Sequence, residues 1–282
     1  MTAVSWISRC LDITWRHRAL AFGAVLLGTL VLLALAAPWL FPGDPHDMVG
    51  APALAPGGDP AFLLGTDLLG RDVAAGLVWG ARVSLFVGLA SAALAIVIGS
   101  VVGVLAGYAR GWTYTLLMRL CELFQTIPHF LFAIFIVAIL GATVRNITLA
   151  IGLTFWPAIA RLVRAQTLLL REMDFVRVAP SMGVSDLRII LTHLLPNAMP
   201  PVIANASILA AIAILSESGL SFLGLGDPNS VSWGGMIGAG REAIRTAWYL
   251  TIIPGAAVLV AVLSLNLIGD GLIGALDPRS RA

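Results

Sequence analysis

The chain has 282 residues, of which 59% are hydrophobic and only 11% are charged, and its mean hydropathy is +0.95. Soluble globular chains carry about 25% charged residues, so this chain has less than half of the charge that a water-exposed surface requires. The composition therefore excludes an ordinary soluble domain and predicts a protein embedded in membrane lipid.

All seventeen basic residues are arginine, and the formal net charge is only +2. The arginines fall between long apolar runs and form no basic cluster with interleaved aromatic residues, which argues against nucleic-acid binding. The two cysteines, Cys10 and Cys121, are too few for a disulfide framework and are expected to be apolar filler.

Six apolar stretches approach the roughly 20 residues that a helix needs to cross ~30 Å of hydrocarbon. The predicted spans are 20–41, 84–108, 120–142, 147–163, 197–216 and 247–269. The fourth is the shortest, because Arg145 and Arg161 bound it and Pro157 interrupts it. The first could instead be a signal peptide cleaved near Ala34-Leu35-Ala36. Its apolar run exceeds the about 7–15 residues of a signal core, which favours a retained anchor.

The placement of the arginines predicts the orientation of the chain. The arginines expected outside are Arg71, Arg82, Arg145, Arg241 and Arg245, and all others fall on the cytoplasmic side if the N-terminus is cytoplasmic. This bias satisfies the positive-inside rule. The resulting segments are a cytoplasmic segment 1–19, an external connector 42–83, a five-helix core 84–272 with an external loop 217–246, and a cytoplasmic tail 273–282. The proline-rich part of the connector, 42–64, is expected to be irregular.

The largest cytoplasmic piece is residues 164–195, here called the coupling segment. Its first half mixes apolar and charged residues, which predicts a short interfacial helix that ends at Gly183. Ser185 is a good N-cap for a second helix that begins at Asp186, whose charge suits the helix dipole. A plain solvated connector is the alternative, but the compact helix, glycine corner and helix suit a rigid docking element, with Phe175 available for a partner's groove.

The docking hypothesis assigns charged, apolar and corner residues of this segment to contact with a partner. They are Arg171, Glu172, Asp174, Phe175, Arg177, Val178, Ala179, Gly183, Ser185 and Asp186.

Two glycine patterns are expected to shape the membrane core. Gly99, Gly103 and Gly107 repeat at four-residue spacing in the second span, which permits close helix packing and is a structural role. The glycine-rich stretch 219–226 is expected to border the channel if it re-enters the membrane, because irregular backbone at that depth must be buried or face water. Outside the membrane it would be a simple loop.

The coupling segment resembles the cytoplasmic signature of inner-membrane permeases of binding-protein-dependent ABC importers. Gly183 is followed ten residues later by His193 and then by Leu195-Pro196, which is the spacing of that signature. The family's Glu-Ala-Ala is replaced by Arg177-Val178-Ala179. Pro180 follows, and it is expected to shorten the helix.

Other stretches are similar to the second permease of the dipeptide, oligopeptide and nickel branch of that family. They are Gly65-Thr66-Asp67-Leu68-Leu69-Gly70-Arg71-Asp72, Gly80-Ala81-Arg82-Val83-Ser84-Leu85, Ser218 to Gly226, Ser232-Trp233-Gly234, Asn266 to Leu272, and Leu276-Asp277-Pro278-Arg279. The resemblance covers residues 20–279. It implies an all-α, six-helix transmembrane permease of the type I importer fold in the bacterial inner membrane. The implied partners are a homologous second permease, two ABC ATPase subunits, an external solute-binding protein and membrane lipid.

The chain lacks what ATP hydrolysis requires. A phosphate-binding loop normally ends in Gly-Lys-Ser/Thr, and this chain contains no lysine. We therefore expect a non-catalytic subunit that binds no cofactor, with ATP and Mg on the partner ATPases. The four histidines are scattered and the two cysteines are remote from them, so no metal site is expected.

Two other classes of function compete with this interpretation. An intramembrane serine hydrolase would use Ser221 of Gly219-Leu220-Ser221, but the histidines are poorly placed to act as its base. An ion-coupled secondary carrier would keep ionisable groups near the membrane midplane, whereas Glu122, Glu217 and Asp270 lie near span ends. Both alternatives are therefore disfavoured.

Overall fold

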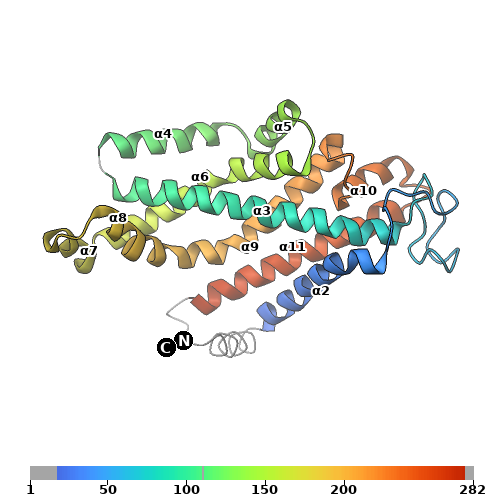
Figure 1. Ribbon diagram of the computed structural model, residues 1–282, viewed down its shortest axis with the longest axis horizontal. Coiled ribbons are helices and arrows are strands. Elements are labelled where there is room, and N and C mark those ends of the chain that lie inside the picture. Colours follow the sequence, from blue (N-terminus) through green and yellow to red (C-terminus); the bar gives the residue numbers. More distant parts are fainter. Residues whose placement is uncertain (1–17, 110, 277–282) are drawn as a thin grey trace.

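The computed structural model describes residues 18–109 and 111–276 (Figure 1). The predicted N-terminal segment up to residue 17, with Cys10, lies outside the described residues, as do Arg110 and the predicted tail beyond residue 276. Within the described ranges every regular element is a helix, and the only bridge between extended residues joins Thr66 and Asp72.

Five of the described helical stretches are long and apolar enough to cross a membrane. They are α2 (Arg18–Leu40), α3 (Val73–Tyr108), α6 (Val144–Arg171), the stretch Asp186–Leu225 that contains α9 (Leu195–Leu220), and α11 (Tyr249–Leu276). A sixth span results if α4 (Trp112–Thr126) and α5 (His129–Leu140) are counted as one bent pair. The all-α transmembrane fold expected from the sequence is confirmed.

The third predicted span, 120–142, is two helices that meet at an angle of 86°. Ile127 is extended, with φ −96° and ψ 131°, because a residue that precedes proline avoids the helical region. Pro128 then opens α5. The Phe124 ring packs edge-on against Phe132 and Trp156, at centroid distances of 5.4 and 5.3 Å. These aromatic contacts hold the bend between α4 and α5 against α6.

The helix α6 is longer than the span 147–163 that the sequence predicts. It begins after Thr143, whose hydroxyl oxygen accepts a hydrogen bond from the Asn146 N–H at 3.2 Å, and it continues through the buried Pro157 to Arg171. Proline removes one helical hydrogen bond, but packing on both sides of α6 holds the helix together. Arg161 consequently lies inside a helix and not at its end.

The helix α3 begins at Val73, inside the predicted connector 42–83. Asp72 caps it, with its Oδ1 accepting from the Ala74 N–H at 2.8 Å. The preceding residues contain no helix but are ordered by hydrogen bonds to Thr66, whose hydroxyl accepts from the Leu54 N–H and whose carbonyl accepts from the Tyr249 hydroxyl. The expected irregular connector is therefore a fixed structure that is fastened to α11.

The helices α3 and α6 lie side by side through most of the molecule (Figure 1). A Cβ added to Gly99 would lie 2.6 Å from Ile159 Cβ, and one on Gly103 would lie 2.5 Å from the Ala160 carbonyl oxygen. On Gly107 it would lie 2.6 Å from Thr167 Cβ. All three glycines thus face α6 and let the two backbones approach closely, which maximises van der Waals contact where no hydrophobic effect operates.

A buried carboxylate joins three helices near the connector end of the bundle. Glu217 of α9 is only 1% exposed and accepts hydrogen bonds from the hydroxyls of Ser84, at 3.1 Å, and Ser221, at 2.7 Å. The Ser84 oxygen accepts in turn from the N–H of Trp233, the first residue of α10 (Trp233–Gly240). Within the stretch 219–226, Ser221–Leu225 form a π-helical turn that continues α9. The Ser221 hydroxyl donates to Glu217 of the same helix.

Replacing Gly103 with leucine should destabilise the bundle. The new side chain would collide with the backbone of α6. Overpacking lowers the free energy of unfolding by about 1–3 kcal/mol, and we expect the upper end of this range because backbone cannot move aside as a side chain can. Thermal unfolding of the detergent-solubilised protein should therefore begin at a lower temperature for Gly103→Leu.

The matched control is Gly28→Leu on α2, because no atom lies within 4 Å of a Cβ at Gly28. An equal loss of thermal stability in both variants would contradict a special contact between α3 and α6.

Candidate functional site

The coupling segment lies at the opposite end of the molecule from the connector and α10 (Figure 1). After α6 ends at Arg171, the chain forms α7 (Asp174–Val178) and a 3-10 turn (Ala179–Met182). It then forms α8 (Asp186–Ile189) and a π-helical turn (Ile190–Leu194) that leads directly into α9. The predicted interfacial helix is thus divided between the end of α6 and the short α7.

Pro180 and Gly183 explain the shape of the corner. The α-helix ends at Val178, and Pro180 lies in the first turn of the 3-10 helix that follows, where its missing N–H costs nothing. Gly183 has φ 77° and ψ 14°, and its N–H donates to the Pro180 carbonyl at 3.0 Å. No atom lies within 4 Å of a Cβ at Gly183, so the position needs glycine for its backbone conformation and not for space.

One side of the corner is anchored in the core. Val176, Ala179, Ile189 and Leu194 are buried, at 0–6% exposure, and belong to the main hydrophobic cluster. Ala179, one of the predicted docking residues, therefore points into the protein. Burial of these four side chains gives the short helices the stability that their length alone cannot provide.

Two hydrogen bonds tie the corner to the end of α3. The Tyr108 hydroxyl donates to Asp186 Oδ1 at 2.6 Å, and Arg171 Nη1 donates to the Gly107 carbonyl at 3.2 Å. Arg171 Nε also lies 3.6 Å from Glu172 Oε1. The predicted docking residues Arg171 and Asp186 thus make contacts within this chain, and the corner is attached to α3 as well as to α6 and α9.

Ser185 occupies the N-cap position of α8, as the sequence predicts. Its carbonyl accepts from the Ile189 N–H at 3.0 Å, but its hydroxyl makes no capping hydrogen bond. Glu172, Asp174 and Arg177 are exposed on the same stretch of chain. Their carboxylate and guanidinium groups are accessible to a partner.

The corner also exposes large apolar side chains. They are Phe175 at 49%, Val178 at 52%, Met182 at 77%, Leu187 at 66% and Leu191 at 53% exposure. Phe175 also packs edge-on against the His193 ring, with 5.9 Å between the centroids. Apolar side chains gathered on one short segment that leaves the bundle are typical of an interaction site.

Sequence reasoning found Phe175 and Val178 but missed Met182, Leu187 and Leu191. Leu187 and Leu191 are four residues apart, so a helical projection of the predicted second helix, 186–195, could have indicated them. In the described ranges, no group of three or more His, Cys, Asp and Glu side chains could hold a metal ion. The geometry at the corner is suited to protein contact.

Residues 99–282 match the family described as "binding-protein-dependent transport system inner membrane component". A peptide transport system permease protein of Brucella abortus is 42% identical over 94% of this chain and 89% of its own length. The di/tripeptide transport system permease protein of Pseudomonas aeruginosa is 39% identical over 94% of this chain and 90% of its own length.

Two further similarities extend this picture. The oligopeptide transport system permease protein of Haemophilus influenzae is 36% identical over 95% of this chain and 86% of its own length. Among solved structures, a chain of the inward-facing MetNI methionine ABC transporter aligns with a TM-score of 0.57 at 20% identity, covering 72% of this chain and 96% of that one. The latter similarity shows a shared fold.

Removing the Tyr108 hydroxyl should loosen the corner without unfolding the bundle. A hydrogen bond to a charged group contributes about 1.5–3 kcal/mol, less where solvent reaches it, so Tyr108→Phe should speed amide hydrogen exchange in residues 174–190 by roughly ten-fold. Exchange in α9 beyond residue 198 should not change.

Tyr114→Phe is the matched control, because the Tyr114 hydroxyl contacts Arg164 on α6 and not the corner. If both variants exchange at the wild-type rate in residues 174–190, the bond between Tyr108 and Asp186 does not hold the corner.

Proposed function

Because the chain belongs to the family of binding-protein-dependent transport system inner membrane components, we propose that it forms half of the import path for a peptide or a peptide-like solute, and that its coupling segment receives the motion of an ATPase. The family resemblance stated from the sequence is confirmed, as is the multi-pass inner-membrane location. The chain is a permease subunit of an ABC importer, and the carrier and hydrolase alternatives are less well supported.

One observation supports the coupling role above the others. The corner joins α6 to α9 covalently, and the bonds from Tyr108 and Arg171 attach it to the end of α3. A force applied to α7 or α8 would therefore displace three spans together. Rigid-body movement of this kind is how ATP-driven closure of a motor domain can tilt a bundle and alternate its access.

The proposal includes a defined set of partners. Importers of this family work with a partner permease, ATPase subunits and a binding protein. Here we infer a homologous second permease, two ATPase subunits at the coupling segments, and a solute-binding protein on the side of the connector. ATP and Mg would be held by the ATPases, and this chain would contribute no catalytic residue.

The solute class rests on the relatives. Those that cover most of this chain are named for transport of di/tripeptides, oligopeptides and glutathione, all of which contain peptide bonds. Uptake of labelled di- and tripeptides by vesicles that contain the assembled transporter tests this assignment. Absence of peptide uptake, together with a non-peptide ligand that co-purifies with the complex and is identified by mass spectrometry, would overturn it.

Replacing Gly183 with valine should uncouple ATP hydrolysis from uptake. A β-branched residue at φ 77° costs on the order of 1–3 kcal/mol, which the corner must relieve by changing shape. Solute imported per ATP hydrolysed should fall, while membrane insertion stays normal. Gly183→Asn is the control, because asparagine tolerates this conformation, and it should transport nearly normally. Wild-type coupling in Gly183→Val would contradict the proposed role of the corner.

A photo-reactive benzoylphenylalanine in place of Phe175 should cross-link to an ATPase subunit in the assembled transporter, because this side chain is half exposed at the corner. The same probe in place of Leu63, which is 77% exposed in the connector, should not. Mass spectrometry of the linked products identifies the partner. The docking hypothesis fails if the probe at position 175 links only to lipid.

A further inference from the structure

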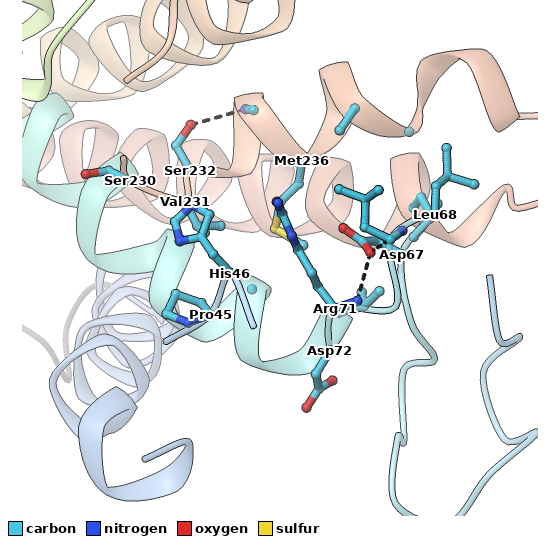
Figure 2. A pocket seen from close by; sticks show the side chains of 17 residues that line it. Pro45, His46, Asp67, Leu68, Arg71, Asp72, Ser230, Val231, Ser232 and Met236 are labelled. Carbon is cyan, nitrogen blue, oxygen red and sulfur yellow. Dashed lines mark hydrogen bonds between the residues drawn. The ribbon is translucent and has the colours of Figure 1, made fainter. Parts of the chain in front are cut away.

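Charged side chains at the connector end of the molecule serve to build that end. Several of them line a pocket of about 360 Å³ between the connector, the start of α3 and α10 (Figure 2). Asp67 and Asp72 line it together with Arg71, and Asp44 also acts on this arginine. Asp67 Oδ1 accepts from the backbone N–H groups of Leu69 and Arg71, each at 2.8 Å, and Asp72 caps α3. These charges balance one another within the connector.

A second group of charged and polar side chains lies on α4, which belongs to the bent membrane-spanning pair. The sequence predicts a span that begins at residue 120 and places Glu122 near its end. In the structure the helix begins at Trp112, so Glu122 lies about 15 Å along it. In Figure 1, α4 starts at the coupling-segment end of the molecule and runs alongside α3. Glu122 therefore lies deeper than the sequence predicts.

Two contacts show how α4 lies against α6. Arg164 Nη2 donates to the Tyr114 hydroxyl at 3.3 Å near the start of α4, and the Phe124 ring packs against Trp156 at 5.3 Å near its end. The two helices therefore run antiparallel over most of the length of α4. Arg161 falls between these contacts, at the level of the middle of α4, and its side chain is exposed.

The exposed surface of α4 is divided into two stripes. Positions three or four residues apart lie on one face of a helix. One such face, here called the polar stripe, consists of exposed residues Thr115, Arg119, Glu122 and Thr126. The next face, here called the leucine stripe, is 41–64% exposed and consists of Leu116, Leu120 and Leu123. The faces are offset by one residue, or about 100° around the helix. The helix therefore meets two different environments.

Aromatic side chains indicate the depth of the polar stripe. Trp79 and Tyr108 are about 43 Å apart along α3, which matches the roughly 40–45 Å thickness of a bilayer with its headgroup regions. Tryptophan and tyrosine concentrate at those regions. Trp112 follows Tyr108 closely at the start of α4 and is 77% exposed. A headgroup region is only about 6 Å thick, so Glu122 lies at the level of the hydrocarbon.

The leucine stripe suits lipid, but the polar stripe does not. Arg119 Nη1 lies 3.0 Å from Glu122 Oε2, and the two side chains are 77% and 62% exposed. Charged side chains within a span almost always face the interior of a bundle or a water-filled cavity. The polar stripe therefore faces away from lipid in the assembled protein.

The hydrogen bonds of the polar stripe favour water over a second protein surface. The Thr115 hydroxyl donates to the Gly111 carbonyl at 3.2 Å, and the Thr126 hydroxyl donates to the Leu123 carbonyl at 2.6 Å. Together with the ion pair, each polar side chain thus has a partner on α4 itself. A contact between membrane helices is built mainly from small residues, whereas arginine and glutamate keep a neighbouring helix at a distance.

We propose that the polar stripe of α4 is part of the wall of the import path in the cytosolic leaflet, and that a passing peptide contacts it. The inference rests on the proposed function and names a surface that the solute meets. A peptide carries an ammonium group, a carboxylate and amide groups. Glu122, Arg119 and the threonine hydroxyls offer each of these a complementary charge or hydrogen bond. The exposed Arg161 lies at the same level and adds a second cation for the carboxylate.

Contacts of this kind suit a path better than a tight binding site. Exposed ion pairs are weak, so water or the charged ends of a peptide can replace the bond between Arg119 and Glu122 at little cost. A transport path needs solute contacts that are favourable enough for entry and weak enough for release.

Thiol reactivity tests the two stripes in the assembled transporter in lipid nanodiscs. In a Cys10→Ser, Cys121→Ala background, Thr126→Cys should react with a charged, water-soluble methanethiosulfonate at least about ten-fold faster than Leu123→Cys, because the reactive thiolate forms in water and not in lipid. Leu123 lies nearer to the start of α4, so depth alone would give the opposite order. Mass spectrometry of this chain measures the two rates.

A larger side chain tests whether solute passes the polar stripe. Thr126→Trp should lower peptide uptake at least about ten-fold while ATP hydrolysis continues, because added bulk narrows the path. Leu123→Trp also adds a large ring, but on the leucine stripe, and should import at nearly the wild-type rate.

Equal reactivity of the two cysteines, or faster reaction of Leu123→Cys, would overturn the inference. So would a Thr126→Cys that reacts only in the chain purified alone, since the polar stripe would then belong to the contact between permeases. Wild-type uptake by Thr126→Trp would overturn it as well. If the wild-type transporter imports no peptide, the proposed function fails, and the thiol rates still decide whether the polar stripe faces water.

Discussion

The close contact between α3 and α6 is the constraint on which the rest of the structure depends. Lipid provides no hydrophobic drive for one helix to bind another, so affinity has to come from packing at short range. The glycines of α3 let the two helix backbones approach closely, because atoms of α6 occupy the space that side chains at these positions would fill. The same contact carries the end of α3 to the corner, where Gly107 accepts a hydrogen bond from Arg171.

The two ends of the bundle are built in different ways. At the corner, short helices are held by buried apolar side chains and by a few bonds to α3, and they expose large apolar groups. At the connector end, hydrogen bonds to Thr66 fasten the irregular chain, and the buried carboxylate of Glu217 joins α9 to α3. The corner is therefore held mainly by apolar packing, and the connector end mainly by hydrogen bonds.

The sequence could predict features that depend on local pattern. The apolar runs gave the spans, the spacing of Gly99, Gly103 and Gly107 indicated a close contact, and Gly183 marked the corner. The start of α3 was misplaced because Asp72 caps a helix that begins in a polar neighbourhood. The bond from Tyr108 to Asp186 joins residues 78 apart, and no local pattern encodes a contact at that separation.

The sharp bend between α4 and α5 has a consequence for what surrounds the subunit. The last carbonyls of α4 have no donor within their own helix, the first amide N–H groups of α5 have no acceptor within theirs, and hydrocarbon offers neither. Irregular backbone at that depth is stable only against protein or water. Residues 126–130 at the break are exposed in this chain, so the shelter has to come from water or from another protein chain.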